Sequence, residues 1–271
     1  MTDSIELNRL SWNERARIHA RDANGFYRLD EFRRGADALF PIEAAEIGDV
    51  SGKRIIHLQC HIGCDTLSLA RRGARVTGLD FSPVALDIAR RLAADAGIEA
   101  DFVEGTVDMA PALRPGPFDL AFTTWGTICW LPDLRDWARS IASVLAPGGE
   151  LYFADAHPSF LVLEEVEGQL EATHGYQTPA DAPLVAVDAT TYTSDPTKLV
   201  HQTTHNWIHS LSSILGALIE AGLAPTMLHE HEALPWRAHA CMRPSQDRLW
   251  RLPEGRPRMP LALSLRARKL G

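Results

Sequence analysis

Long apolar runs are absent from the sequence, since no stretch of about 18 consecutive apolar residues of the kind that spans a membrane occurs. The opening residues Met1-Thr2-Asp3-Ser4 have neither the basic nor the apolar region of a secretory signal. Internal repeats and low-complexity segments are also missing. These absences predict a globular protein that acts in the cytoplasm and does not bind a membrane.

Cysteine is scarce, with four residues in a chain of 271. They are widely scattered: Cys60, Cys64, Cys129 and Cys241. A disulfide framework in a chain of this length needs more cysteines than four, so the thiols are expected to be reduced. Cys60 and Cys64 stand beside His57 and His61 in a spacing conceivable for zinc, but no second ligand pair is nearby. We therefore expect no metal site.

Basic residues are outnumbered, because 27 Lys and Arg face 35 Asp and Glu and the formal net charge is −8. Nucleic acids and anionic membranes are bound by basic surfaces, so neither is an expected partner. The one basic run, Arg266-Ala267-Arg268-Lys269, is expected to be a solvated tail. Apolar and charged shares of 45% and 23% are typical of globular chains, and the length fits one large α/β domain with an insertion or cap.

Strand and helix patterns alternate between residues 53 and 155. Strands are expected at 54–58, 74–80, 100–103, 118–123 and 149–155, with helices at 66–72, 82–96 and 134–145. Gly73 ends the first of these helices, and Ser82-Pro83 begins the second with a favourable N-cap and first turn. The alternation predicts a doubly wound, mostly parallel α/β sheet, whose ligand crevice lies at the carboxyl ends of its strands.

The segments on either side of this core are less regular. Residues 1–50 are polar and helical with interleaved aromatic side chains, and we expect them to form a cap or a lid. Residues 51–271 would form the main domain, with an insertion around 156–205. A helix at 210–221 and a strand at 225–230 are expected to follow. The proline-containing tail from Leu234 should add an edge strand or hairpin and then wrap the surface.

The segment HLQCHIGCDT, which begins at His57, and Asp80, 23 residues beyond it, resemble motifs I and II of the class I S-adenosylmethionine (SAM) dependent methyltransferases. In that family an acidic residue precedes three alternating glycines. Here His57 replaces the acid, Gln59 and His61 replace two glycines, and Gly63 remains. Because these replacements restrict φ, we expect the loop to adopt a non-glycine geometry or to open slightly.

Two further segments support the same resemblance. Phe118-Asp119-Leu120 is similar to motif IV, and Leu145-Ala146-Pro147-Gly148-Gly149-Glu150-Leu151 is similar to the turn before the fifth strand. The resemblance implies a Rossmann-like fold, SAM as cofactor with S-adenosylhomocysteine (SAH) as product, and O- or N-methylation of a small aromatic or heterocyclic acceptor. A non-catalytic or regulatory SAM-fold protein and an NAD-dependent oxidoreductase remain alternatives, as do a monomer and a homodimer.

Cofactor contacts are expected at the carboxyl ends of the strands. The resemblance implies that Asp80 accepts hydrogen bonds from the ribose hydroxyls, although it can also cap the next helix. Phe81 would contact the adenine. Thr106 stands where the family often places an aspartate, so its hydroxyl, the Val107 amide or Asp108 would bind the adenine amino group. The expected set is His57, Gln59, His61, Gly63, Asp80, Phe81, Thr106, Val107 and Thr124.

Acceptor contacts are expected from the loop after the fourth strand and from scattered aromatic and histidine side chains. Trp125 is either a wall of the methyl-transfer site or a core aromatic residue. The other expected acceptor contacts are His19, Tyr27 and Trp207. A general base is needed only for a protonated acceptor such as a phenol, and His157 and His205 are the candidates. Each histidine can equally be a structural residue.

Overall fold

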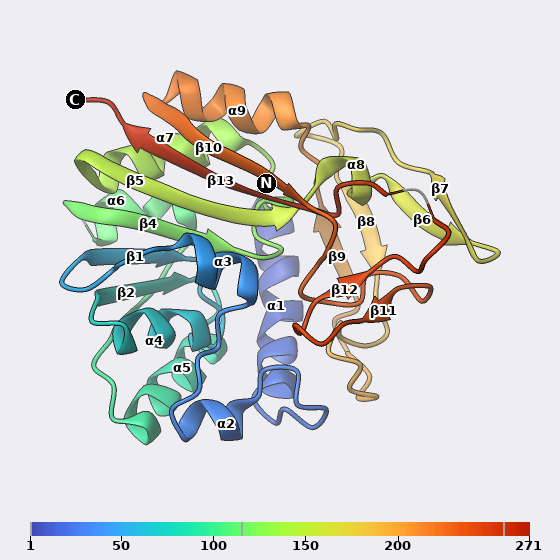
Figure 1. Cartoon of the computed structure of the whole chain (residues 1–271), viewed down its shortest axis with the longest axis horizontal. Coiled ribbons are helices and arrows are strands. Elements are labelled where there is room, and N and C mark those ends of the chain that lie inside the picture. Colours follow the sequence, from blue (N-terminus) through green and yellow to red (C-terminus); the bar gives the residue numbers. More distant parts are fainter. Residues whose placement is uncertain (1, 115, 257) are drawn as a thin grey trace.

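The computed structural model describes residues 2–114, 116–256 and 258–271. Its central sheet has seven strands in the order β10-β13-β5-β4-β1-β2-β3 (Figure 1). Their bounds are β1 Arg54–Leu58, β2 Arg75–Asp80, β3 Asp101–Glu104, β4 Phe118–Thr124, β5 Leu145–Ala156, β10 Leu223–His231 and β13 Ala262–Lys269. Neighbouring strands from β3 to β5 pair in parallel, whereas β13 is antiparallel to both β5 and β10. The doubly wound, mostly parallel sheet is thus confirmed.

Helices cover both faces of this sheet. They are α4 Cys64–Arg71, α5 Pro83–Ala96, α6 Ala110–Leu113, α7 Leu134–Val144 and α9 Leu211–Glu220, with short 3-10 turns η1 Val107–Met109 and η2 Ile128–Trp130. On β1, the side chain of Ile56 belongs to the same hydrophobic cluster as buried residues of α7 and α9. The side chain of its neighbour Ile55 packs on the other face, in a cluster that includes residues of α4. Both side chains are fully buried. Successive strand residues point to opposite faces, so a sheet covered twice needs apolar residues at both positions.

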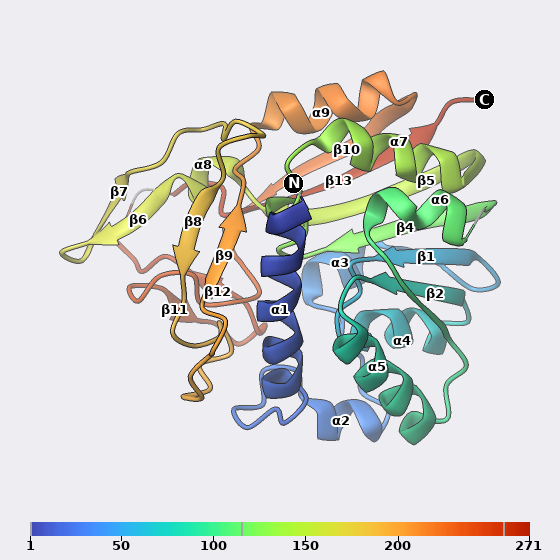
Figure 2. The same cartoon turned by 180° about the vertical axis from the view of Figure 1, so that it is seen from behind.

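The N-terminal segment forms α1 Thr2–His19, α2 Leu29–Arg33 and α3 Pro41–Glu46. In both views α1 stands between the carboxyl ends of the strands and a set of small hairpins (Figures 1 and 2). The side chain of Asn8 on α1 forms two hydrogen bonds of 2.9 Å with the backbone of His205. These bonds tie α1 to the hairpins across the crevice.

The small hairpins come from two separate stretches of chain. The first contributes α8 Pro158–Leu161, β6 Leu163–Val166, β7 Gln169–Ala172, β8 Leu184–Val187 and β9 Thr203–Asn206, and the second contributes β11 Arg243–Pro244 and β12 Trp250–Arg251. β6 pairs with β7, β8 with β9, and β11 with β12. They lie beyond the carboxyl ends of the parallel strands (Figure 1). Among the described residues, no helix has the length and apolar character needed to cross a membrane.

The C-terminal strand corrects two expectations. The tail forms the expected hairpin through β11 and β12, but β13 lies inside the sheet, between β5 and β10, so an edge strand and a solvated basic tail were wrong. Ala267 is fully buried, and Arg266 pairs with Glu150 of β5 at 2.8 Å. The charges of this segment suggested a solvent-exposed tail, because the carboxylate that pairs with them, Glu150, is more than a hundred residues away in the sequence. The expected helix at 210–221 and strand at 225–230 correspond to α9 and β10.

Candidate functional site

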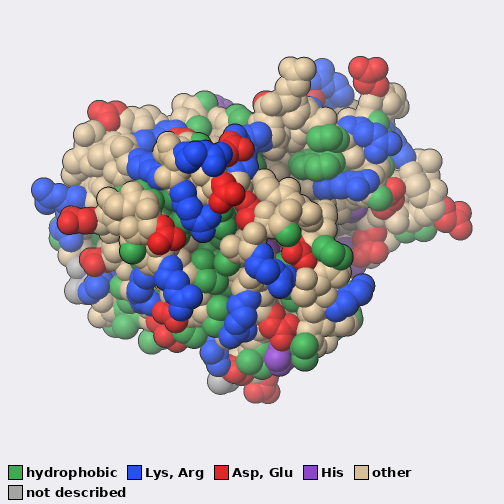
Figure 3. All heavy atoms as spheres, turned by 90° about the horizontal axis from the view of Figure 1, so that it is seen from below, with side chains coloured by type: hydrophobic (Ala, Val, Ile, Leu, Met, Phe, Trp, Pro, Cys, Tyr) green, Lys and Arg blue, Asp and Glu red, His purple; other side chains and the backbone are tan. Residues whose placement is uncertain are grey.

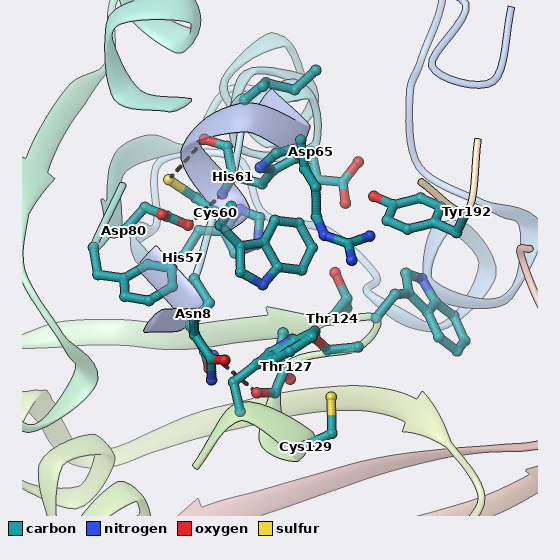
Figure 4. Close-up of a pocket in the computed structure, with 18 of the residues that line it drawn as sticks. Asn8, His57, Cys60, His61, Asp65, Asp80, Thr124, Thr127, Cys129 and Tyr192 are labelled. Atoms are coloured by element: carbon teal, nitrogen blue, oxygen red, sulfur yellow. Dashed lines mark hydrogen bonds between the residues drawn. The ribbon is translucent and has the colours of Figure 1, made fainter. Parts of the chain in front are cut away.

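A cavity of about 720 Å³ lies at the carboxyl ends of the parallel strands. Its walls come from the loops after β1, β2, β3 and β4, from α1, and from segments 188–192 and 235–248. Figure 4 shows part of this lining, with Asp80 on one side of the cavity and Tyr192 on the other. The crevice therefore lies where a doubly wound sheet places its ligands.

The loop after β1 keeps a left-handed backbone without its glycines. The φ angles of Gln59, His61 and Gly63 are 57°, 50° and 78°. The expectation of a non-glycine geometry was wrong, because tertiary contacts hold the two larger residues in place. Gln59 Nε2 donates to the Thr127 carbonyl at 2.9 Å, and the His61 amide donates to Asp80 at 2.8 Å. Such bonds offset a conformational cost of about 1–2 kcal/mol per residue.

Gly63 is the position where only glycine fits. A Cβ atom built there would lie 2.8 Å from Ala89 Cβ on α5 and 3.0 Å from the ring of Phe102 on β3. Real Cβ atoms do not tolerate the shorter distance, and the φ of 78° adds strain for an L side chain. The last glycine of the motif thus permits the close approach of α4 to its neighbours.

Asp80 ends β2 and is almost fully buried, with 5% of its surface exposed. One carboxylate oxygen accepts from the His61 amide and the other from the Ser82 amide, each at 2.8 Å. Burial raises the pKa of Asp80 to about 6, although these amides favour the ionised form. A carboxylate has about four acceptor positions, so further capacity remains toward the cavity that it lines.

Two histidines of the loop are neutral. Burial lowers the pKa of His57 to about 3, and burial together with the Arg15 charge lowers that of His61 to about 3. His57 Nδ1 lies 2.8 Å from the Thr66 hydroxyl, and His61 Nε2 lies 2.8 Å from His19 Nδ1. The histidine in place of the family's acid therefore contributes hydrogen bonding and packing, without charge.

Asp155 organises the loop after β4, a role that sequence reasoning missed. Asp155 is the second-last residue of β5 and is 4% exposed. Its carboxylate accepts hydrogen bonds from the amides of Gly126, Thr127 and Ile128 at 2.7, 2.9 and 3.3 Å. The available signal was an acidic residue at the carboxyl end of a central strand. This carboxylate holds the loop that carries Trp125, whose φ is 53°.

Several buried polar atoms on the cavity wall have no hydrogen-bond partner in the described part of the chain. They are Trp12 Nε1, Gln59 Oε1, Thr124 Oγ1, Trp125 Nε1 and Trp137 Nε1. Buried polar groups are nearly always hydrogen-bonded in folded proteins. Their gathering around one cavity indicates that a ligand with both donors and acceptors completes the site.

The structure places the expected site residues in three groups. The whole expected cofactor set and two expected acceptor residues line the cavity: His57, Gln59, His61, Gly63, Asp80, Phe81, Thr106, Val107, Thr124, Tyr27 and Trp125. His19 lies behind this wall, bonded to His61 and Thr191. Trp207 lines a separate cavity of about 70 Å³.

The two expected bases lie outside the cavity lining. His157 caps α8 and its Nε2 is 3.2 Å from Glu230. His205 is on β9, with its Nδ1 2.8 Å from the Ser4 hydroxyl. Neither ring is therefore positioned in the lining to take a proton from a molecule in this cavity.

The half of the cavity away from Asp80 is aromatic with a few charged groups. Its rings come from segments far apart in the sequence: Phe26, Tyr27, Phe40, Trp125, Tyr192 and Trp236. Asp65, Arg15 and Arg248 also line it, and none of these three was singled out from the sequence. Burial and the Asp37 charge raise the pKa of Asp65 to about 6. Only the fold shows that these residues meet.

The described residues provide no cluster suited to a metal ion, and one face of the molecule carries charges of both signs. In residues 2–114, 116–256 and 258–271, no cluster of three or more His, Cys, Asp or Glu could hold a metal ion. Cys60 and Cys64 are buried free thiols. On the face shown in Figure 3, acidic and basic side chains are interspersed. This mixture does not favour nucleic acid on that face.

Comparison with known proteins relates the first part of the sheet to one enzyme class. Residues 55–149 match the family model described as a methyltransferase domain. The ubiquinone biosynthesis O-methyltransferases of Escherichia coli and Shigella boydii are 33% identical over 111 residues, which is 41% of this chain and 46% of theirs. The match thus spans less than half the length of these curated relatives.

Solved structures extend the similarity of fold to most of the chain. A SAM-dependent methyltransferase from Mesorhizobium loti is 22% identical with a TM-score of 0.59, covering 87% of this chain and 99% of that one. A putative one from Listeria monocytogenes is 15% identical with a TM-score of 0.58, covering 84% and 95%. The similarity of fold therefore extends well beyond residues 55–149.

Proposed function

Since this chain belongs to the class I SAM-dependent methyltransferases through its domain at residues 55–149, we propose that it methylates a small molecule carrying an aromatic or heterocyclic ring. The observation that carries the proposal is the left-handed loop at Gln59, His61 and Gly63 beside the buried Asp80, all on one cavity. A molecule with a ribose and an amino-acid end fits this lining, because both donors and acceptors are left unpartnered on it.

In this proposal the cofactor half of the cavity holds SAM. Asp80 accepts from the ribose hydroxyls, and Phe81, Thr106 and Val107 contact the adenine. The free Oε1 of Gln59 offers an acceptor to the ammonium of the methionine part, since its Nε2 is already used by the loop. When bound, SAM supplies an electrophilic methyl group on a positively charged sulfur. The protein's contribution is positioning and exclusion of water.

The acceptor occupies the aromatic half of the cavity in this proposal. Tyr27 and Trp125 form part of its wall, and His19 supports the wall through His61. Trp207 lies behind it on the smaller cavity. The segment before β1 supplies the lid, because α1 places Trp12 and Arg15 on the cavity wall. An aromatic lining favours a planar, partly apolar acceptor over a highly charged one.

Calorimetric titration of the purified chain with SAM, SAH and NAD tests the proposal. SAM and SAH should bind with one-to-one stoichiometry, and NAD should give no saturable heat. Binding of NAD in preference to SAM would favour an oxidoreductase. Binding of SAM without methyl incorporation into any acceptor of a broad aromatic panel would favour a non-catalytic SAM-binding protein.

A further inference from the structure

Asp65 is an ionisable side chain of the cavity that the assignments above leave without a role. It stands in the first turn of α4, two residues after Gly63, and lines the cavity. Two other carboxylates of the lining are already engaged, Asp80 by two amides and Asp188 by Arg15 at 2.9 Å. Asp65 has no ion-pair partner within 4.0 Å in the described part of the chain. Its carboxylate is therefore available to a bound molecule.

The groups around Asp65 suit an acceptor with a polar reacting group on a flat ring. Figure 4 shows Asp65, Thr124 and Tyr192 bordering one space, on the far side of the cavity from Asp80. Thr124 is 6% exposed and its buried hydroxyl has no partner among the described residues, and Trp125 Nε1 is likewise unpaired. The ring of Trp125 lies 6.3 Å from that of Trp236 in an edge arrangement. The polar groups thus gather at one point of an aromatic chamber.

Charged and titratable groups from five neighbouring segments set the electrostatics of this space. Arg248, which stacks over Phe40 at 4.6 Å, favours the ionised form of Asp65. Glu43 on α3 is fully buried, and burial raises its pKa to about 8, so it is neutral at pH 7. Asp37 is paired with Arg72. Arg15, which pairs with Asp188, and the Cys64 thiol also line this space, as do Tyr27 and Tyr192, whose hydroxyls are hydrogen-bonded to each other and whose pKa values are raised by burial.

From this arrangement we infer that Asp65 takes the proton of the acceptor's nucleophile, and that the acceptor is an aromatic molecule bearing a hydroxyl or amine at its reacting position. The inference rests on the proposed function. The acceptor's oxygen or nitrogen forms a bond to the methyl carbon as the bond from that carbon to sulfur breaks. The electron pair of the broken bond stays on sulfur, which becomes a neutral thioether, and the proton passes to the Asp65 carboxylate and then to solvent.

The same role is not available to the histidines of this region. His57 and His61 are used as hydrogen-bonding members of the loop, through Thr66 and His19. Burial keeps both rings neutral with pKa values of about 3, so they are weak bases. Asp65 has a pKa of about 6 and is largely ionised at pH 7. An efficient general base has a pKa near the working pH and a partner within reach.

The test compares wild type with D65N, D65E and the control D87N, whose carboxylate pairs with Arg90 on the outer surface of α5. The probes are phenols, catechols and anilines, each with its fully methylated counterpart, assayed with radiolabelled SAM. D65N should keep SAM affinity within about twofold and lose about a hundredfold or more in turnover. D65E should retain more turnover than D65N, and D87N should match wild type.

A second readout is the pH profile, which a purely structural role of Asp65 would not produce. The kcat of wild type at saturating SAM should rise with pH through an apparent pKa near 6 as Asp65 ionises, and D65N, which keeps Asp80 with its own pKa of about 6, should lose this rise. Turnover by D65N within about threefold of wild type, or a flat profile below pH 7, would overturn the assignment of the base. Wild type that binds SAM and methylates none of the probes would overturn the acceptor class. Wild type that does not bind SAM would overturn the proposed function itself.

Discussion

The two halves of the cavity are built in different ways. The half beside Asp80 is made of short consecutive loops after β1, β2 and β3, and its shape is held by backbone hydrogen bonds such as those of Asp80 with His61 and Ser82. The half beside Tyr192 is assembled from segments as distant as Phe26 and Trp236, and Trp125 Nε1 and Thr124 Oγ1 have no partner there among the described residues. The first half is rigid before any ligand binds, whereas the second depends on side chains and their ionisation.

The largest expected effect is on stability and comes from a change in the half of the cavity beside Asp80. Gly63→Ala should lower the free energy of unfolding by about 2–4 kcal/mol, because the new Cβ meets Ala89 at 2.8 Å and the φ of 78° is strained. SAM binding should be lost with it. Gly97→Ala is the matched control, since it has a φ of 65° and nothing within 4 Å, and should cost only about 1–2 kcal/mol. Chemical denaturation measures both, and equal losses would contradict the close approach.

Removing the charge of Asp80 comes next. Asp80→Asn should weaken SAM binding by about 1.5–3 kcal/mol, the cost of losing a charged acceptor for the ribose. An amide keeps one oxygen for the loop, so the fold should be less disturbed than by alanine. Asp49→Asn, an exposed site in the turn before β1, is the control. Titration calorimetry would reject the assignment if the Asp80 variant bound SAM as tightly as wild type.

Glu43 tests how far the acceptor half depends on ionisation. Its pKa is about 8 in the folded chain and 4.5 in the unfolded chain, so the folded state binds the proton more tightly. Stability should therefore fall as pH rises from about 4.5 to about 8. Glu43→Gln should reduce that loss by about 1–3 kcal/mol. Thermal melting across this pH range measures it, and parallel pH curves for the two proteins would show that Glu43 ionises normally.

The smallest expected effect comes from one indole nitrogen. Trp125→Phe keeps the aromatic wall but removes the unpaired Nε1. SAM affinity should stay within about twofold. The KM of an aromatic acceptor that the wild type methylates should rise about three- to tenfold. Trp250→Phe, on β12 and outside the cavity lining, is the control. A parallel loss of SAM and acceptor affinity would place Trp125 in the rigid half instead.

The sequence alone determined the parallel strands β1 to β5 and the placement of Gly63 and Asp80 at their carboxyl ends. Strand and helix periods are local, and the HLQCHIGCDT segment, Asp80 and the PGG turn are separated by spacings that the parallel fold requires. The positions of Gly63 and Asp80 on one cavity followed from the order of the strands. Local signals suffice there because consecutive loops of a parallel sheet all end at the same edge.

Tertiary structure decided the rest. The left-handed φ of Gln59 and His61 is opposed by local preference and is held by Thr127 and Asp80 from other strands. The place of β13 inside the sheet depends on Glu150, a partner far away in sequence. Asp65 is a candidate base only because the fold brings aromatic side chains from distant loops together around it. Burial and long-range pairing set the energies of these groups, and neither is a property of a short segment of sequence.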